Sequence, residues 1–144
     1  MDIFSQGPAG GPGGASVNVS IPENRNISAF EVFSGSVIDK VVFFCAPDAT
    51  DSIAIGGGGG TSSGRIEIPK GRLIRTIFGR HGEYIDSLTF IDDSGNVLGR
   101  FGGGGGDLDF IFEIPSCVRL VGFRGRAGDV VNAFGLNYAP PLAP

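Results

Sequence analysis

The sequence has 144 residues, which is enough for one domain with its own hydrophobic core. Its formal net charge is −4 and its Lys and Arg residues do not cluster, so the basic surface typical of a nucleic-acid-binding protein is missing. Two cysteines are too few for a disulfide framework, and no apolar run approaches the ~18 residues that span a bilayer.

The start of the chain lacks a basic region followed by an apolar run, the pattern of a signal peptide. We therefore expect a cytoplasmic location, with secretion by another route left open. Cys45 and Cys117 stand in different sequence contexts and are expected to be free thiols. The 26 glycines alone would be compatible with disorder, but apolar runs such as 41–44 predict a folded chain.

The predicted elements are β-strands separated by glycine-rich runs and turns. A glycine-rich run at 10–14 opens the first unit, and alternation of apolar and polar residues over 17–21 predicts a half-buried strand. Further strands are expected at 30–33, 37–44 and 52–55. No window of the chain shows a sustained helical period.

The same order of elements occurs twice more. In the second unit a glycine run at 56–60 precedes strands at 65–68, 73–78, 84–91 and 97–101. Asp-Ser-Gly-Asn at 93–96 predicts a hairpin turn between the last two of these strands. In the third unit a glycine run at 102–106 precedes strands at 111–114, 118–121 and 130–136.

Ile-Pro pairs set the register of the repeat. They begin at residues 21, 68 and 114, and fourteen residues after each Ile stands a glycine, namely Gly35, Gly82 and Gly128. Each glycine opens a five-residue loop that closes on Asp39, Asp86 or Asn132. We call 35–39, 82–86 and 128–132 the Asp/Asn loops, and 10–14, 56–60 and 102–106 the glycine loops. We predict one domain over 1–144 with internal repeats at about 10–55, 56–101 and 102–140.

Three units of this size cannot bury their apolar faces separately. Packed around a common axis they form one core, which predicts an all-β fold of three four-stranded antiparallel sheets with pseudo-threefold symmetry. A trefoil barrel also has three repeats, but its units usually lack the pairing of a glycine run with a Gly-x-x-x-Asp segment.

Several motifs together resemble the jacalin-related lectin family over nearly the whole chain. Residues 123–136 are similar to its closing signature, 34–39 and 85–90 to its first and second repeats, and 7–14 to its opening loop. The resemblance implies a β-prism I fold and a non-enzymatic lectin of the mannose type, with no cofactor and no metal. Galactose-preferring members have a processed chain whose new N-terminus helps to form the site; here the segment before Gly10 is intact, which favours mannose.

The resemblance also implies up to three sugar sites at one end of the sheets. Each would pair an Asp/Asn loop with a glycine loop: 128–132 with 10–14, 35–39 with 56–60, and 82–86 with 102–106. The predicted sugar-binding residues are Gly35, Val37, Ile38, Asp39, Gly59, Gly60, Gly82, Tyr84, Ile85, Asp86, Gly105, Gly106, Gly13, Gly14, Gly128, Val130, Val131 and Asn132. The sequence departs from the family in having Asn132 in place of the usual Asp and no Trp in the opening loop.

The residue types suit a hydroxyl-rich ring. An ionised Asp has two acceptor oxygens and can take charge-assisted hydrogen bonds from two neighbouring hydroxyls. Glycine lets the backbone approach the ligand closely, so that peptide N–H groups can donate. Asn132 carries no charge, so weaker or altered selectivity is expected there. Tyr84 could stack on the apolar face of a sugar.

The same residues also bear on phosphate binding, catalysis and protein interaction. The glycine runs lack the Gly-Lys-Ser/Thr and the helix of a phosphate-binding loop. His81 lies near Asp86 and Ser87, but one β segment does not give the geometry of a catalytic triad, so no enzyme is expected. A protein-interaction or structural module with the same fold but without sugar binding stays as the alternative.

Two further features are left open by the sequence. Arg80 and Arg126 occupy equivalent repeat positions, where they would either serve solubility or touch a ligand at the rim. The expected partners are mannose- or glucose-containing glycans, with neither nucleic acid nor membrane insertion, and a homodimer is left open as an assembly.

Overall fold

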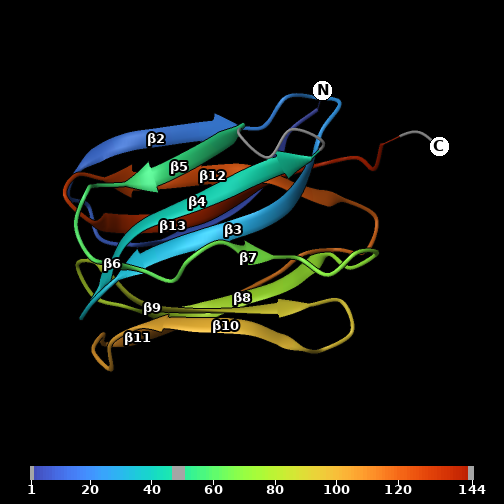
Figure 1. Ribbon diagram of the computed structural model, residues 1–144. Helices are drawn as coiled ribbons and strands as arrows, with labels where there is room; N and C mark the ends of the chain where they lie inside the picture. The colour runs from blue at the N-terminus through green and yellow to red at the C-terminus, as the bar shows by residue number, and fades with distance from the viewer. Residues whose placement is uncertain (1, 47–50, 143–144) are drawn as a thin grey trace.

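The computed structural model describes residues 2–46 and 51–142. Thirteen β-strands are assigned within these ranges and form three antiparallel sheets (Figure 1). Over the same ranges, no helix has the length and apolar character needed to cross a bilayer. The predicted all-β architecture is confirmed.

Each of the three sheets, I, II and III, is built around a central hairpin of two long strands. Sheet I has the order β1 (Phe4–Gly10), β13 (Val131–Ala139), β12 (Arg119–Ala127), β2 (Ala15–Ser20). Sheet II has the order β5 (Ser52–Gly56), β4 (Ile38–Ala46), β3 (Asn26–Ser34), and its fourth place is shared by β6 (Thr61–Ser62) and β7 (Ile66–Glu67). Sheet III has the order β10 (Val97–Gly102), β9 (Ile85–Asp92), β8 (Ile74–His81), β11 (Leu108–Glu113).

One sequence repeat does not make one sheet. The first strand of each repeat leaves its own unit. In the second and third repeats it pairs with the hairpin of the preceding repeat, so β6 and β7 pair with β3 and β11 pairs with β8, whereas β2 of the first repeat pairs with β12 of the last. Both ends of the chain therefore meet in sheet I, where β1 pairs with β13. This exchange links the three sheets in a closed circle.

Three local elements differ from the sequence prediction, and one of them is the two-residue strand β6, which was not expected. Residues 4–10 form strand β1, although this segment had been assigned no strand. The strand expected at 65–68 is reduced to Ile66–Glu67. Between β6 and β7, Ser63 donates its backbone N–H to Val32 O at 2.8 Å, and its hydroxyl accepts from Val32 N at 3.1 Å in place of a backbone carbonyl.

Aromatic pairs join the sheets in one core. Phe30 of sheet II stacks on Phe90 of sheet III with a centroid distance of 4.5 Å. Phe43 of sheet II packs on Phe123 of sheet I at 4.2 Å. All four rings are fully buried. The contacts cross between sheets, so the apolar faces of all three contribute to the same interior.

The topology places the loops of interest at one end of the prism. The Asp/Asn loops connect β3 to β4, β8 to β9 and β12 to β13, and they lie at the left end in Figure 1. The start of β1 and the close of β13 lie at the opposite end, where Phe4 pairs with Tyr138 (Figure 1).

Candidate functional site

The three Asp/Asn loops share one backbone turn. In each, the N–H of the opening glycine donates to the carbonyl two residues on: Gly35 to Val37 at 3.0 Å, Gly82 to Tyr84 at 3.1 Å, and Gly128 to Val130 at 3.0 Å. The repeat register predicted from the sequence therefore extends to individual hydrogen bonds.

Each glycine loop docks on the Asp/Asn loop predicted to be its partner. The second glycine of the run donates its N–H to the carbonyl of the residue that closes the Asp/Asn loop: Gly57 to Asp39 at 2.9 Å, Gly103 to Asp86 at 3.0 Å, and Gly11 to Asn132 at 2.9 Å. The three predicted loop pairs are thus brought together at one end of the molecule.

The side chain of the closing residue lies directly against the last two glycines of its partner loop. A Cβ on Gly60 would stand 2.6 Å from Asp39 Oδ1, and one on Gly59 would stand 3.0 Å from Oδ2. A Cβ on Gly105 would stand 2.9 Å from Asp86 Oδ2. Only glycine leaves the peptide this close to the carboxylate, so a ligand at the carboxylate would also meet bare backbone.

Asn132 makes the corresponding contact with neutral groups. A Cβ on Gly14 would stand 2.7 Å from Asn132 Oδ1, and one on Gly13 would stand 2.9 Å from its Nδ2. The residue is only 7% exposed, whereas Asp39 and Asp86 are half-buried. The end of the prism that carries these loops, called the rim below, therefore has two acidic residues and one uncharged, more enclosed residue.

Some predicted site residues face away from the rim. The side chains of Ile38, Ile85 and Val131 are fully buried in the common core, so these residues could meet a ligand only through their backbone groups. Tyr84 is 42% exposed and free to present its ring. Val37 and Val130 are half-buried.

An open hollow of about 470 Å³ lies over the Asn132 site and draws on all three Asp/Asn loops. Its lining residues are Gly14, Ser36, Val37, Tyr84, Gly128, Asp129, Val130 and Asn132. Ser36 and Asp129 were not predicted as site residues. They occupy the variable positions of the Gly-x-x-x-Asp pattern, so only the convergence of three loops identifies them.

The glycine loops also hold the three sites to one another. A Cβ on Gly57 would stand 2.3 Å from Asp129 O, one on Gly11 2.4 Å from Glu83 O, and one on Gly103 2.6 Å from Ser36 O. Each glycine loop thus packs on the Asp/Asn loop of another sheet as well as its own. The six loops form a continuous ring.

Arg80 and Arg126 also belong to this ring. Arg80 donates from Nη2 to Gly106 O at 2.7 Å, and Arg126 donates from Nη2 to Gly14 O at 2.7 Å. Their partners are carbonyls of the glycine loops. The equal spacing of the two arginines signalled an equivalent role, but the acceptors followed only from the strand register.

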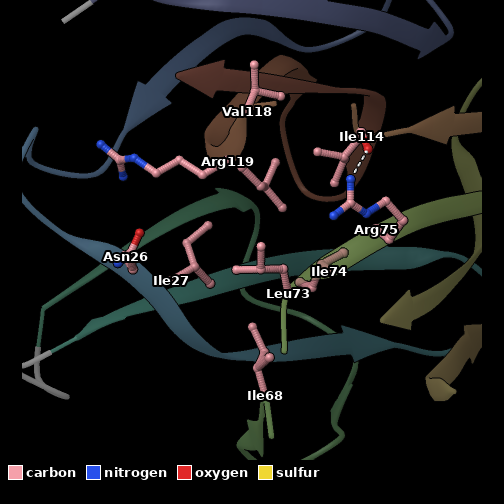
Figure 2. Close-up of a pocket in the computed structure, with 10 residues that line it drawn as sticks. Asn26, Ile27, Ile68, Leu73, Ile74, Arg75, Ile114, Val118 and Arg119 are labelled. Carbon is pink, nitrogen blue, oxygen red and sulfur yellow. Dashed lines mark hydrogen bonds between the residues drawn. The ribbon is translucent and has the colours of Figure 1, made fainter. Parts of the chain in front are cut away.

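The opposite end of the prism carries a narrow crevice lined mostly by aliphatic side chains (Figure 2). The starts of the central strands bring together Ile27, Ile74 and Leu120, and Arg75 donates to Ile114 O at 2.9 Å. The enclosed space is about 20 Å³, room for roughly one water. This crevice closes the core and is too small for a ligand.

The remaining reactive residues do not converge. His81 lies with Nδ1 3.1 Å from Gly82 O and its ring 5.9 Å from that of Phe110. Within 2–46 and 51–142, His, Cys, Asp and Glu side chains do not gather in threes as metal ligands. Cys45 is buried, Cys117 is exposed, and both are free thiols, as expected.

Comparisons with known proteins agree with this geometry. A family model for the jacalin-like lectin domain matches residues 6–137. Horcolin from Hordeum vulgare is 29% identical over 143 residues, covering 93% of this chain and 95% of the relative. A mannose/glucose-specific lectin from Parkia platycephala is 32% identical over 154 residues, covering 97% of this chain and 33% of the relative.

Solved structures share the arrangement of sheets. AcmJRL, a mannose binding jacalin related lectin from Ananas comosus, superposes with a TM-score of 0.78 at 28% identity, covering 96% of this chain and 99% of that one. Malaysian banana lectin superposes with a TM-score of 0.79 at 23% identity, covering 97% and 100%. The predicted prism of three sheets is confirmed.

Proposed function

This chain belongs to the jacalin-like lectin domain family, and on that premise we propose that it binds mannose- and glucose-type glycans reversibly, without chemical conversion, at the Asp39, Asp86 and Asn132 sites. The observation that carries the proposal is the threefold contact of an Asp or Asn side chain with a pair of glycines at one end of the prism. The names of the Parkia and Ananas relatives support mannose as the first ligand to test.

The chemistry of binding follows from the two kinds of group that each site brings together. The carboxylate of Asp39 or Asp86 accepts hydrogen bonds from two adjacent ring hydroxyls, and these charge-assisted bonds are the stronger kind. Glycine backbone N–H groups donate to the hydroxyl oxygens. Tyr84, which is 42% exposed and lines the hollow over the Asn132 site, offers an aromatic face to the ring carbons of a sugar bound there.

One shallow site should bind a single sugar weakly. We expect a dissociation constant on the order of millimolar, or about −4 kcal/mol. Since the three sites lie on one ring of loops, a surface carrying many glycans can engage more than one of them, and the avidity then exceeds the affinity of any single site.

Calorimetry tests the proposal directly. Methyl α-mannoside, methyl α-glucoside and methyl α-galactoside are titrated into the wild-type protein and into the double variant Asp39→Ala/Asp86→Ala. We expect mannoside and glucoside to bind the wild type in preference to galactoside. We expect the double variant to lose most of this binding, since only the uncharged Asn132 site is intact.

A matched control separates the sites from general charge. The double variant Glu67→Ala/Glu113→Ala also removes two carboxylates, but from exposed positions outside the ring of loops. It should bind as the wild type does. Mannoside binding that survives unchanged in Asp39→Ala/Asp86→Ala would refute the site assignment, and a folded wild type that binds no glycan on an array would favour a protein-interaction module.

A further inference from the structure

Arg80 and Arg126 occupy one structural position in two of the three sheets. Arg80 on β8 pairs across the strands with Asp109, and Arg126 on β12 pairs with Ser16. The corresponding residue on β3 is Phe33, which pairs with Ser62. The chain thus provides its own comparison between an arginine and a phenylalanine at the same place.

Both guanidinium groups bind a glycine loop. Arg80 donates to Gly106 O and Arg126 to Gly14 O. Arg126 also donates from Nε to Pro12 O at 2.9 Å and to Gly13 O at 3.1 Å. These bonds have a charged donor and so are stronger than ordinary backbone bonds. The planar guanidinium can hold two acceptors in a fixed geometry, which a flexible ammonium cannot.

The other side of each guanidinium is anchored to the neighbouring strand. Arg80 Nη1 donates to Asp109 Oδ1 at 2.6 Å, and Arg126 Nη1 donates to Ser16 Oγ at 3.1 Å. The peptide between Gly106 and Asp107 is also held from behind, since Asp107 N–H donates to His81 O at 3.0 Å. That peptide is therefore fixed through both its carbonyl and its N–H.

The Asp39 site is built differently at this position. Phe33 has no donor for a carbonyl, and its ring lies 5.6 Å from Lys40 Nζ. Ser62, the cross-strand neighbour of Phe33, donates its hydroxyl to Glu31. The side chains here contact one another across neighbouring strands, and Phe33 cannot replace the arginine bond to the glycine loop.

We propose that Arg80 and Arg126 are positioning residues that hold the glycine loops of the Asp86 and Asn132 sites in the geometry that binds ligand. The Asp86 site is then the tightest of the three, because it combines a carboxylate with an arginine clamp. A loop that is ordered before binding loses less conformational freedom when the ligand arrives. The affinity order rests on the proposed function; the clamp itself does not.

Arg80→Phe tests the proposal, because it places in sheet III the residue that sheet II has naturally. Amide hydrogen exchange is measured without ligand, and methyl α-mannoside is then titrated with detection of each site by NMR. We expect exchange at Asp107 to rise about tenfold and the affinity of the Asp86 site to fall about tenfold, as suits loss of a charged hydrogen bond. Arg80→Lys keeps a charged donor, so both the rise in exchange and the loss of affinity should be smaller than in Arg80→Phe.

Arg124→Phe is the matched control. Arg124 is an exposed arginine on β12 that donates to Ser5 Oγ at 2.8 Å, and its loss removes the same charge without touching a glycine loop. It should leave both readouts of the Asp86 site unchanged.

The outcomes distinguish the two proposals. Unchanged exchange at Asp107 in Arg80→Phe overturns the clamp, and faster exchange with unchanged affinity at the Asp86 site overturns its role in binding. An Asp39 site that binds more tightly than the Asp86 site in the wild type also overturns the order. If the wild type binds no sugar, the proposed function fails, while the exchange contrast between wild type and Arg80→Phe still decides whether the clamp exists.

Discussion

Individual glycines at the rim are not equivalent, although they stand in one uninterrupted run. Gly60 has a φ of +80° and a Cβ there would meet both Asp39 Oδ1 and Ser34 N within 2.8 Å. Gly58, two residues earlier in the same run, has no atom within 4 Å of such a Cβ. An alanine methyl group would therefore clash at Gly60 but meet open space at Gly58.

This difference gives a prediction at a single methyl group. Gly60→Ala should destabilise the loop by about 1–2 kcal/mol, the typical difference for a non-glycine residue in the left-handed region, and should weaken binding at the Asp39 site alone. Gly58→Ala should change neither stability nor binding by a measurable amount. Thermal unfolding and site-resolved NMR titration measure the two effects. Equal effects from both substitutions would contradict this account of the loop.

The sequence predicts the rim residues well where the pattern is periodic. The loop glycines and the residues Asp39, Asp86 and Asn132 all lie where the repeat register indicated. Pattern alone could not separate side chains from backbone within the loops, so Ile38 was placed at the site although its side chain is in the core. The acceptors of Arg80 and Arg126 are carbonyls distant in sequence, and a residue type does not reveal such partners.

The β9–β10 hairpin shows how one side chain can define a turn between two elements. Asp92 Oδ1 accepts hydrogen bonds from Ser94 Oγ at 2.7 Å, Ser94 N at 2.9 Å and Asn96 N at 2.9 Å. These bonds favour the charged carboxylate, the Ser94 hydroxyl most of all, and they hold the pKa of Asp92 below its ordinary value. The Asp-Ser-Gly-Asn signal at 93–96 predicted the turn but not the preceding Asp92 that fixes it.

Linkage turns this lowered pKa into a prediction on acid stability. A carboxyl whose pKa is lower in the folded state stabilises the protein above its unfolded pKa of about 3.9, and this contribution is lost as the pH falls through the folded value. The difference in urea midpoint between wild type and Asp92→Asn should therefore narrow as the pH falls from 7 to below about 4. Ser94→Ala removes the strongest donor to Asp92. Its urea midpoint at pH 7 should therefore lie between those of the wild type and Asp92→Asn. A difference that stays constant with pH would contradict the role given to Asp92.

Strand neighbours were harder to predict than strands. Alternation of apolar and polar residues tells which face of a strand is buried, but it does not tell which strand lies alongside. This explains why the exchange of β2, β6, β7 and β11 between repeats was not predicted. Strand β1 was missed for a related reason: Gly7, Pro8 and Gly10 have little intrinsic β-preference, and the segment is extended because it pairs with β13.

Unfolding should involve the whole molecule at once, since the strands are exchanged and the core is shared. Phe30 lies in sheet II, yet its ring stacks on Phe90 in sheet III. Phe30→Ala should lower the free energy of unfolding by about 3–5 kcal/mol, the usual range for a buried Phe. Circular dichroism can follow urea denaturation, because the chain has no Trp for fluorescence.

Phe78→Ala serves as the control for the core substitution. Phe78 lies on β8 of sheet III but is 39% exposed, so its loss should change stability by less than about 1 kcal/mol. Both variants should retain a single transition. A second transition in Phe30→Ala would mean that sheet II can separate from the other two, against a common core.

The family resemblance read from the sequence holds for the molecule as a whole, since the match to the jacalin-like lectin domain covers residues 6–137. The repeat spacing predicted three sheets around one axis, and the comparisons agree. What spacing could not predict was the closed circle, because closure depends on residues at the two ends of the chain meeting in sheet I.

The placement of Phe4 and Tyr138 at the end remote from the ring of loops has a practical consequence. Anything joined covalently to the chain just before β1 or just after β13 would emerge on the side facing away from the glycine loops. A bead, a dye or a neighbouring domain attached there would leave the opposite pole uncovered. Molecules immobilised in this way would all present the ring of loops to the surrounding solution.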